Sequence, residues 1–247
     1  MHNALPILDL FIILIFIFHV LFSVDLLSGN NMLNTSVYDF IRIKIASMEY
    51  APGSNFSEMD LVKELGTPRA KIREAFSRLA QDNLIQIIPQ RCTTICKLEL
   101  GNILDSIFIV RSILIAVIKD VHSQNIEKEL TLSQLRDSLL TIESGAVFSD
   151  LDFFKADHHF YLTLSGLNGF PRLNKIIFKE KLNIDRTLRL SVGRRADYIS
   201  IARLYRRVLD GLLSAAPDKS IKAICEMAIT LEAFAKLAKK NNPSLFI

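Results

Sequence analysis

Three cations crowd the start of a predicted helix in the stretch LGTPRAKIREAFSRLAQDNLI, residues 65–85. Arg69, Lys71 and Arg73 fall within its first two turns, where the helix dipole disfavours positive charge. Backbone N–H groups at the same end are available to phosphate oxygens. The pattern therefore predicts a negatively charged partner outside the chain.

The predicted helix is amphipathic, and its charges flank its apolar side. At 100° per residue, Arg69 and Arg73 lie along one edge of the apolar stripe, and Lys71 and Arg78 lie along the other. The stripe consists of Ile72, Ala75, Phe76 and Leu79. This placement suits a helix that packs on its own domain and presents cations to a phosphate-lined groove. The alternative is an ordinary solvated basic edge, which is the commoner fate of a charge cluster.

Bulk composition places the chain among globular proteins. It has 247 residues, of which 50% are hydrophobic and 23% are charged, so one large domain or two modest ones are expected. The net charge of +4 permits a nucleic-acid partner without arguing for one. Three cysteines at no zinc-like spacing fit a reducing cytoplasm.

Residues 1–31 form a separate hydrophobic segment that includes the uncharged stretch LFIILIFIFHVLFSV, residues 10–24. The stretch is shorter than the roughly 20 residues of a spanning helix, and no basic leader precedes it. Three interpretations are open. The segment is outside the working protein and translation starts at Met32, or it is a membrane anchor, or it is a buried or partner-binding helix. We favour the first because Met32 lies just before a well-formed globular pattern.

Residues 33–98 predict two helices, a glycine turn, a third helix and a β-hairpin. Thr35 and Ser36 are the cap candidates of the first helix, and Pro52-Gly53 is expected to stop it. Ser57 is expected to cap the second helix, and Gly66 to end it. Thr67 is expected to cap the third helix, with Pro68 at its first position. The stretch LIQIIPQRCTTICKL, residues 84–98, reads as two short strands around a Pro-Gln-Arg-Cys turn. This order is the layout of a winged helix-turn-helix domain.

Residues 99–241 are strongly helical in pattern and are followed by a short tail, residues 242–247. About six helices with short connections are expected, which predicts an antiparallel bundle. The fold class is therefore mainly α: a winged helix-turn-helix followed by an all-α antiparallel bundle.

Three stretches carry a resemblance to a known family. They are YAPGSNFSEMDLVKELG at 50–66, TPRAKIREAFSRLAQDNLI at 67–85 and, more weakly, DHHFYLTLSGLNGFPRL at 157–173. The chain resembles GntR-type bacterial transcription regulators, specifically the FadR-like branch with a helical FCD effector domain. The resemblance implies a homodimer that binds a short palindrome in double-stranded DNA. No nucleophile–base pair, phosphate loop or full metal set is visible in the sequence, so an enzyme is not expected.

By this resemblance, the DNA-binding residues are Arg69 and Arg73 in the recognition helix, with the wing tip reaching the minor groove. We add Thr67, Lys71 and Arg91 as candidates. The chain departs from the family at three positions. Pro68 and Ala70 stand where the family often has hydroxyl side chains that touch phosphate, and Cys92 replaces the wing-tip glycine. Arg91 beside it can compensate electrostatically.

The effector domain departs further. Many family members hold a divalent metal with one Asp and three His. Asp157 matches the Asp, but the three His positions align with Tyr161, Tyr205 and Thr230. Neutral hydroxyls are poor ligands for such ions, so no metal or other cofactor is expected. The neighbouring His158 and His159 point about 100° apart on a helix and cannot replace a facing set.

The same four residues predict two alternatives: a pocket for a small organic acid or acyl-CoA effector, or a satisfied buried network. Arg111 matches a family arginine and is a candidate for an anionic ligand or an interdomain contact, and Arg186 is a second cation near the pocket. The expected function is a ligand-responsive cytoplasmic transcription regulator. The rival interpretations are a membrane-tethered regulator and a metal-dependent or enzymatic helical module.

Overall fold

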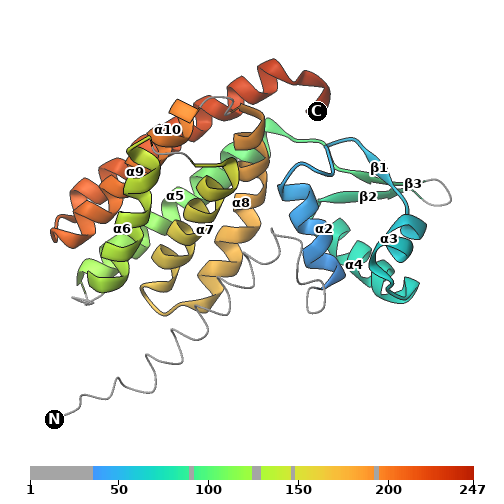
Figure 1. Cartoon of the computed structure of the whole chain (residues 1–247), viewed down its shortest axis with the longest axis horizontal. Coiled ribbons are helices and arrows are strands. Elements are labelled where there is room, and N and C mark those ends of the chain that lie inside the picture. The colour runs from blue at the N-terminus through green and yellow to red at the C-terminus, as the bar shows by residue number, and fades with distance from the viewer. Residues whose placement is uncertain (1–35, 89–91, 124–128, 146–147, 192–194) are drawn as a thin grey trace, which may run out of the picture.

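The computed structural model describes residues 36–88, 92–123, 129–145, 148–191 and 195–247, and it forms two bodies (Figure 1). A small helical domain with a three-stranded sheet is followed by a larger helical bundle. The hydrophobic extension of residues 1–31 lies outside the described residues. The mainly helical fold class predicted from the sequence is confirmed.

The N-terminal domain begins with α2 (Val37–Ala46), followed by α3 (Glu58–Leu65) and α4 (Arg69–Gln81). Ser36 and Ser57 cap the first two of these helices, each accepting a hydrogen bond from the backbone N–H three residues on. Gly66 ends α3 with a left-handed φ of 59°. The predicted caps are therefore correct, but α2 ends at Ala46, before the predicted stop at Pro52-Gly53.

The start of α4 differs from the prediction. Pro68 is the N-cap, and no side chain caps the helix. Its ψ of 141° is extended, so the helix can begin only at Arg69. The Thr67 hydroxyl, which was expected to cap α4, donates instead to the backbone carbonyl of Leu65 at 3.2 Å.

The hairpin consists of β2 (Ile85–Ile88) and β3 (Cys92–Ile95), paired antiparallel with Ile85 opposite Ile95. Cys92 belongs to the strand and not to the turn, and residues 89–91 lie outside the described part of the chain. A short strand that the sequence did not predict, β1 (Asn55–Phe56), pairs with β3 and gives the order β1-β3-β2.

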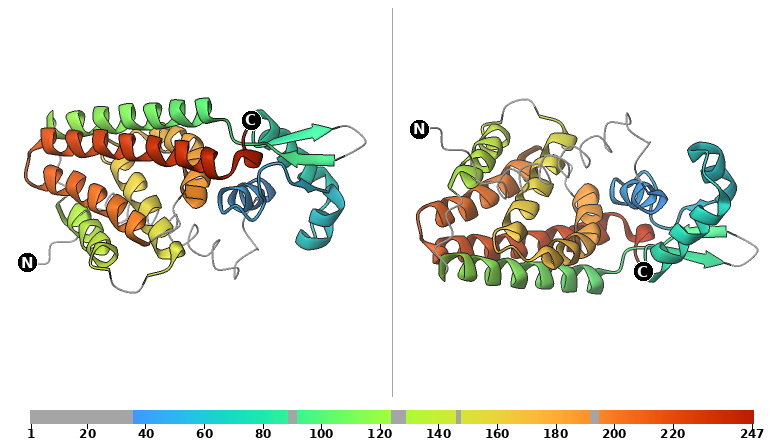
Figure 2. Two further views of the ribbon diagram at one scale, coloured as in Figure 1. Left: turned by 90° about the horizontal axis from the view of Figure 1, so that it is seen from above. Right: turned by 90° about the horizontal axis from the view of Figure 1, so that it is seen from below.

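The bundle is built from six described helices: α5 (Leu100–Ser123), α6 (Glu129–Glu143), α7 (Asp150–Gly166), α8 (Pro171–Ser191), α9 (Arg195–Leu213) and α10 (Pro217–Asn241). Their number matches the prediction. The α7 helix starts with a full capping box between Ser149 and Asp152. Figure 2 shows α5 and α10 side by side along one face of the bundle.

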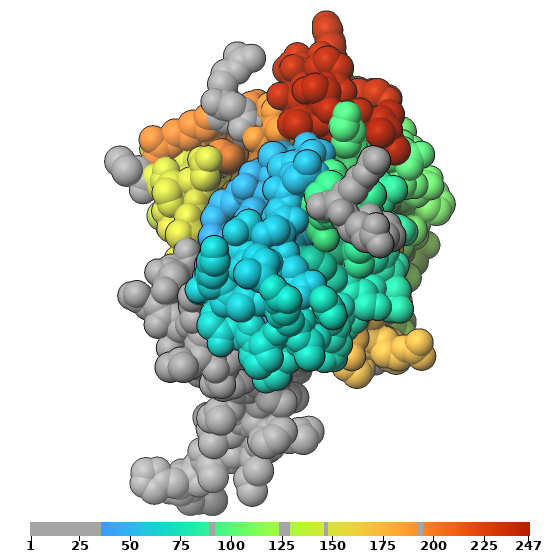
Figure 3. Space-filling view, turned by 90° about the vertical axis from the view of Figure 1, so that its right-hand side faces the viewer, coloured from blue at the N-terminus to red at the C-terminus, as the bar shows by residue number. Residues whose placement is uncertain are grey.

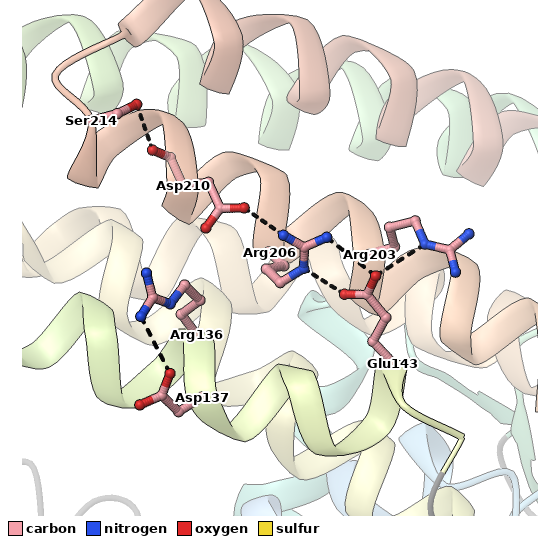
Figure 4. Close-up of polar contacts among 7 residues, drawn as sticks. All are labelled: Arg136, Asp137, Glu143, Arg203, Arg206, Asp210 and Ser214. Carbon is pink, nitrogen blue, oxygen red and sulfur yellow. Dashed lines mark hydrogen bonds and ion pairs between the residues drawn. The ribbon is translucent and has the colours of Figure 1, made fainter.

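An ion cluster ties α6 to α9 at the edge of the bundle (Figure 4). The carboxylate of Glu143 accepts bonds from Arg206 at 2.5 Å and from Arg203 at 3.1 Å. Arg206 also pairs with Asp210, one turn further along α9, at 2.6 Å. Glu143 therefore joins the end of α6 to two cations on the neighbouring helix.

The final residues of the chain pack where the N-terminal domain meets the bundle. After the 3-10 turn η1 (Pro243–Leu245), Phe246 is buried and pairs with Leu98 in a parallel bridge. The Leu98 N–H donates to the carbonyl of Leu245, and the Ile247 N–H donates to the carbonyl of Leu98, both at 2.9 Å. The tail thus packs on the segment that links the sheet to α5.

Candidate DNA-binding surface and buried polar cluster

The α4 helix divides its side chains as the sequence pattern predicts. Ile72, Phe76 and Leu79 are buried in the core of the N-terminal domain. Arg69, Lys71 and Arg73 are exposed. This domain faces the viewer in the space-filling view (Figure 3). The cations therefore lie on a solvated surface that a groove of DNA can reach.

Glu58, at the start of α3, organises the two arginines. Its Oε2 lies 3.1 Å from Nε of Arg73, and its Oε1 lies 3.8 Å from Nε of Arg69. Arg69 also contacts the sulfur of Met59. The side chain of Arg73 is 69% exposed, and that of Arg69 is 56% exposed. Both guanidinium groups are thus oriented by protein contacts and still open to a partner.

An open hollow lies between α4 and the sheet, on the side of Arg73. Its lining combines the charged pair with polar and apolar side chains: Glu58, Arg73, Phe76, Ser77, Ala80, Gln81, Ile87 and Thr93. Of the other candidates, Thr67 is partly exposed beside the start of α4. Arg91 lies outside the described residues.

The bundle core brings three of the candidate effector residues together. Asp157 on α7 is buried, and its Oδ1 accepts a hydrogen bond from the Tyr205 hydroxyl on α9 at 2.5 Å. Tyr161 lies one turn from Asp157 and packs edge-on against Tyr205, with ring centroids 5.9 Å apart. Burial raises the pKa of both phenols well above the usual value. Both therefore stay neutral and can donate hydrogen bonds.

Lys181 on α8 is the member of this cluster that the sequence analysis missed. Its Nζ lies 2.5 Å from Asp157 Oδ2 and 2.6 Å from Asp185 Oδ1. It also sits 4.4 Å from the centroid of the Tyr161 ring. Burial alone would lower the pKa of Lys181, but the two carboxylates outweigh burial and raise it. The ammonium is therefore charged. Its signal in the sequence was a cation on the apolar face of α8, where Ile177, Ile184 and Leu188 are buried.

Other residues expected in the pocket lie elsewhere. The Thr230 hydroxyl donates to the carbonyl of Glu226 on its own helix, and Met227 contacts the Tyr161 hydroxyl instead. Arg111 stacks over Phe108 on α5. Arg186 faces the domain boundary and donates to the carbonyl of Cys96 at 2.8 Å.

The two histidines do not form a metal site with Asp157. The His158 ring stacks on Phe178 at 4.5 Å, and burial lowers the pKa of His159. Within the described ranges, no group of three or more His, Cys, Asp or Glu residues could hold a metal ion. The donor set around Asp157, with two phenols and an ammonium, does not fit a divalent metal.

One described helix, α5, is long and apolar enough to cross a membrane by length and composition alone. It packs against α8 and α10 within the bundle. An 18-residue window of α5 has a mean hydropathy of 1.9, and 39% of that window is buried. Its buried side chains belong to the core of the bundle, and Phe108 is the large apolar side chain of α5 that is exposed.

The sequence and the fold both match known regulators. Residues 33–95 match the family model described as "Bacterial regulatory proteins, gntR family". The HTH-type transcriptional repressor RspR of Escherichia coli (strain K12) is 28% identical over 206 residues, covering 83% of this chain and 87% of the relative. An uncharacterised HTH-type regulator from Streptomyces ambofaciens is 24% identical over 177 residues, covering 71% of this chain and 73% of the relative.

Solved structures share the fold at lower identity. E. coli McbR/YncC has a TM-score of 0.68 at 17% identity and covers 83% of this chain and 97% of its own. A GntR transcriptional regulator from Rhodococcus sp. RHA1 has a TM-score of 0.65 at 20% identity, and the match covers 81% of this chain and 95% of that one.

The helices α2 to α4, with the exposed cations of α4, and the three-stranded sheet define a winged helix-turn-helix domain. Residues 33–95 therefore match the gntR family of bacterial regulatory proteins, and the relatives that match most of the chain are described as HTH-type transcriptional regulators.

Proposed function

We propose that this protein is a ligand-responsive, homodimeric GntR regulator of the FadR-like branch. Residues 33–98 bind a short palindromic operator in the cytoplasm, and residues 99–241 form an FCD-type effector and dimerisation domain. The observation that carries this proposal is the exposed, Glu58-oriented pair of arginines on α4. Arg69 and Arg73 contact bases or phosphates of the DNA, and Lys71, Thr67 and Arg91 add contacts to the DNA backbone.

A dimer fits the apolar outer face of the bundle. Phe108 on α5 is 58% exposed, and Ile229 and Leu237 on α10 are 66% and 41% exposed. The two helices lie side by side along one face of the bundle (Figure 2), and in this proposal their exposed apolar side chains contribute to one apolar surface. A second copy of the chain is its occupant in our proposal, because a palindrome needs two recognition helices at a fixed spacing.

The α8 helix couples the two bodies because it contacts both. Leu182 packs into the core of the N-terminal domain, whereas the adjacent Lys181 belongs to the buried cluster of the bundle. The carbonyl of Phe178 accepts a bond from Arg42 on α2, and Arg186 holds the linker at Cys96. A shift of α8 therefore moves the DNA-binding domain relative to the bundle.

The effector in this proposal is a small organic acid or acyl-CoA that acts on the buried cluster. The acceptor atoms of Asp157 are already bonded to Tyr205 and Lys181. In this proposal the ligand replaces at least one of these bonds and thereby displaces α7, α8 or α9. A coupling of about 1–3 kcal/mol would make a useful switch.

Selection of bound duplexes from a random DNA pool tests the DNA-binding part of this proposal. We expect enrichment of one sequence with two inverted half-sites, bound far more tightly than either half-site alone. Enrichment of a single, asymmetric site would contradict the dimeric mechanism. The absence of any enriched sequence would contradict sequence-specific binding altogether.

A further inference from the structure

The Lys181 ammonium occupies the centre of three helices. Its side chain is only 2% exposed, and its partners come from α7 (Asp157 and the ring of Tyr161) and from one turn further along α8 (Asp185). Through Asp157 the cluster reaches Tyr205 on α9. A buried ammonium without such partners would lose its proton, so these contacts are what keep the charge in place.

The charges of the cluster balance within the chain. When both are ionised, Asp157 and Asp185 supply two negative charges, and Lys181 supplies one positive charge. Arg189, one turn beyond Asp185, supplies the second, and its guanidinium lies over the Phe154 ring at 3.6 Å. Burial raises the pKa of Asp185, and the Lys181 ammonium opposes that shift. Burial lowers the pKa of Arg189, and the carboxylate of Asp185 opposes that shift. A divalent ion would add an excess charge of two.

The acceptor atoms are also in use. One oxygen of Asp157 accepts the Tyr205 hydroxyl and the other accepts the Lys181 ammonium. We propose that the Lys181 ammonium is a built-in cation that takes the place of a divalent metal at Asp157. It joins α7, α8 and α9 without any bound ion. This inference rests on the proposed effector domain and not on DNA binding.

Metal content and thermal stability of the full chain give the first test. Protein purified without chelator is analysed for metals, and its Tm is measured with EDTA and with added Mn²⁺, Ni²⁺ or Zn²⁺. We expect no stoichiometric metal and an unchanged Tm. One equivalent of metal retained after dialysis, or a Tm raised by any of the three ions, would overturn the proposal.

Charge removal gives the second test. Lys181→Met keeps the length of the side chain and leaves two carboxylates facing one cation, so Tm should fall by roughly 10 °C. Lys175→Met, at an exposed position of the same helix, is the matched control and should leave Tm unchanged. Equal Tm values for these two variants would overturn the proposal.

A double variant separates charge pairing from packing. Asp157→Asn with Lys181→Met removes both charges and leaves Asp185 with Arg189, so it should recover part of the lost Tm. If Lys181→Met does not fold, a double variant that does fold equally supports pairing between the two charges. A double variant less stable than Lys181→Met, or unfolded, contradicts the built-in cation. None of these measurements uses DNA, so they leave the DNA-binding proposal to its own test.

Discussion

The Nε atom of Arg73 lies 3.1 Å from the Oε2 atom of Glu58, so an acid on α3 holds a cation of the recognition helix. A guanidinium has five N–H donors, and this bond uses only the one on Nε. The two terminal nitrogens are left for a base edge or a phosphate. In the proposed complex, Glu58 therefore orients Arg73 for bidentate contact and also places a negative charge close to the DNA.

Glu58→Gln should raise affinity for random DNA and reduce discrimination. The substitution removes a charge that repels phosphate and loosens the arginine that reads the site. We expect the ratio of operator to scrambled-duplex affinity to fall by roughly three- to tenfold. Fluorescence anisotropy with both duplexes measures it, with Glu129→Gln on the bundle surface as control. An unchanged ratio would mean that Glu58 does not position Arg73.

Phe108→Glu should convert a dimer to a monomer. The substitution places a charge in the apolar surface of α5 and α10, where burial against a second copy would leave it unpaired. Light scattering after gel filtration should then give the chain mass of 28.0 kDa. Leu130→Glu is the control, because Leu130 is 74% exposed on α6, away from this surface. Equal masses for the two variants would place the dimer contact elsewhere.

Arg186→Gln should loosen the linker between the two bodies. Arg186 is 1% exposed, and burial lowers its pKa to about 10, so it is charged at neutral pH. Loss of its bond to the Cys96 carbonyl should cost about 2 kcal/mol. Hydrogen exchange at residues 96–98 should quicken roughly tenfold, whereas Arg172→Gln on the exposed start of α8 should change nothing. Unaltered hydrogen exchange at residues 96–98 in Arg186→Gln would contradict a role of α8 in coupling the two bodies.

Glu143→Gln should reduce stability at neutral pH and make it less sensitive to acid. The hydrogen bond from Arg206, supported by Arg203, lowers the pKa of Glu143 below 4.5. A lowered folded-state pKa gives stability that is present above pH 4.5 and is lost as the pH falls through the folded value. Urea titrations from pH 7 to pH 3 should show the difference between wild type and variant shrink from about 1 kcal/mol toward zero. A difference that grows in acid would contradict this sign.

Local signals made much of the fold predictable. The serine caps at Ser36, Ser57 and Ser149 and the left-handed Gly66 act within a few residues of the helix end. The β1 strand was not predictable in this way, because two residues become a strand only through pairing with the distant β3. Pro68 was misplaced by one position because its ψ angle, and not its ring, decides where α4 begins.

The buried cluster around Asp157 could be predicted only in part from the sequence. Asp157, Tyr161 and Tyr205, which the family resemblance grouped as an effector site, lie together in the bundle core, and their role in effector binding stays a prediction. Helical periodicity places Lys181 on the apolar face of α8, but only the fold reveals the two carboxylates that neutralise it, so the sequence analysis missed its part in the cluster. Thr230 bonds to the Glu226 carbonyl of its own helix, and Met227, three residues earlier on α10, contacts Tyr161 instead.

The central claim is that Arg69 and Arg73 bind DNA, and operator affinity of the Arg69→Ala and Arg73→Ala variants tests it most directly. Each substitution should weaken operator binding by about 1–3 kcal/mol, with circular dichroism and Tm matching wild type. Lys222→Ala, an exposed cation on α10, removes the same charge from the bundle and should leave affinity unchanged. Wild-type operator affinity in a folded Arg69→Ala/Arg73→Ala protein would contradict the account.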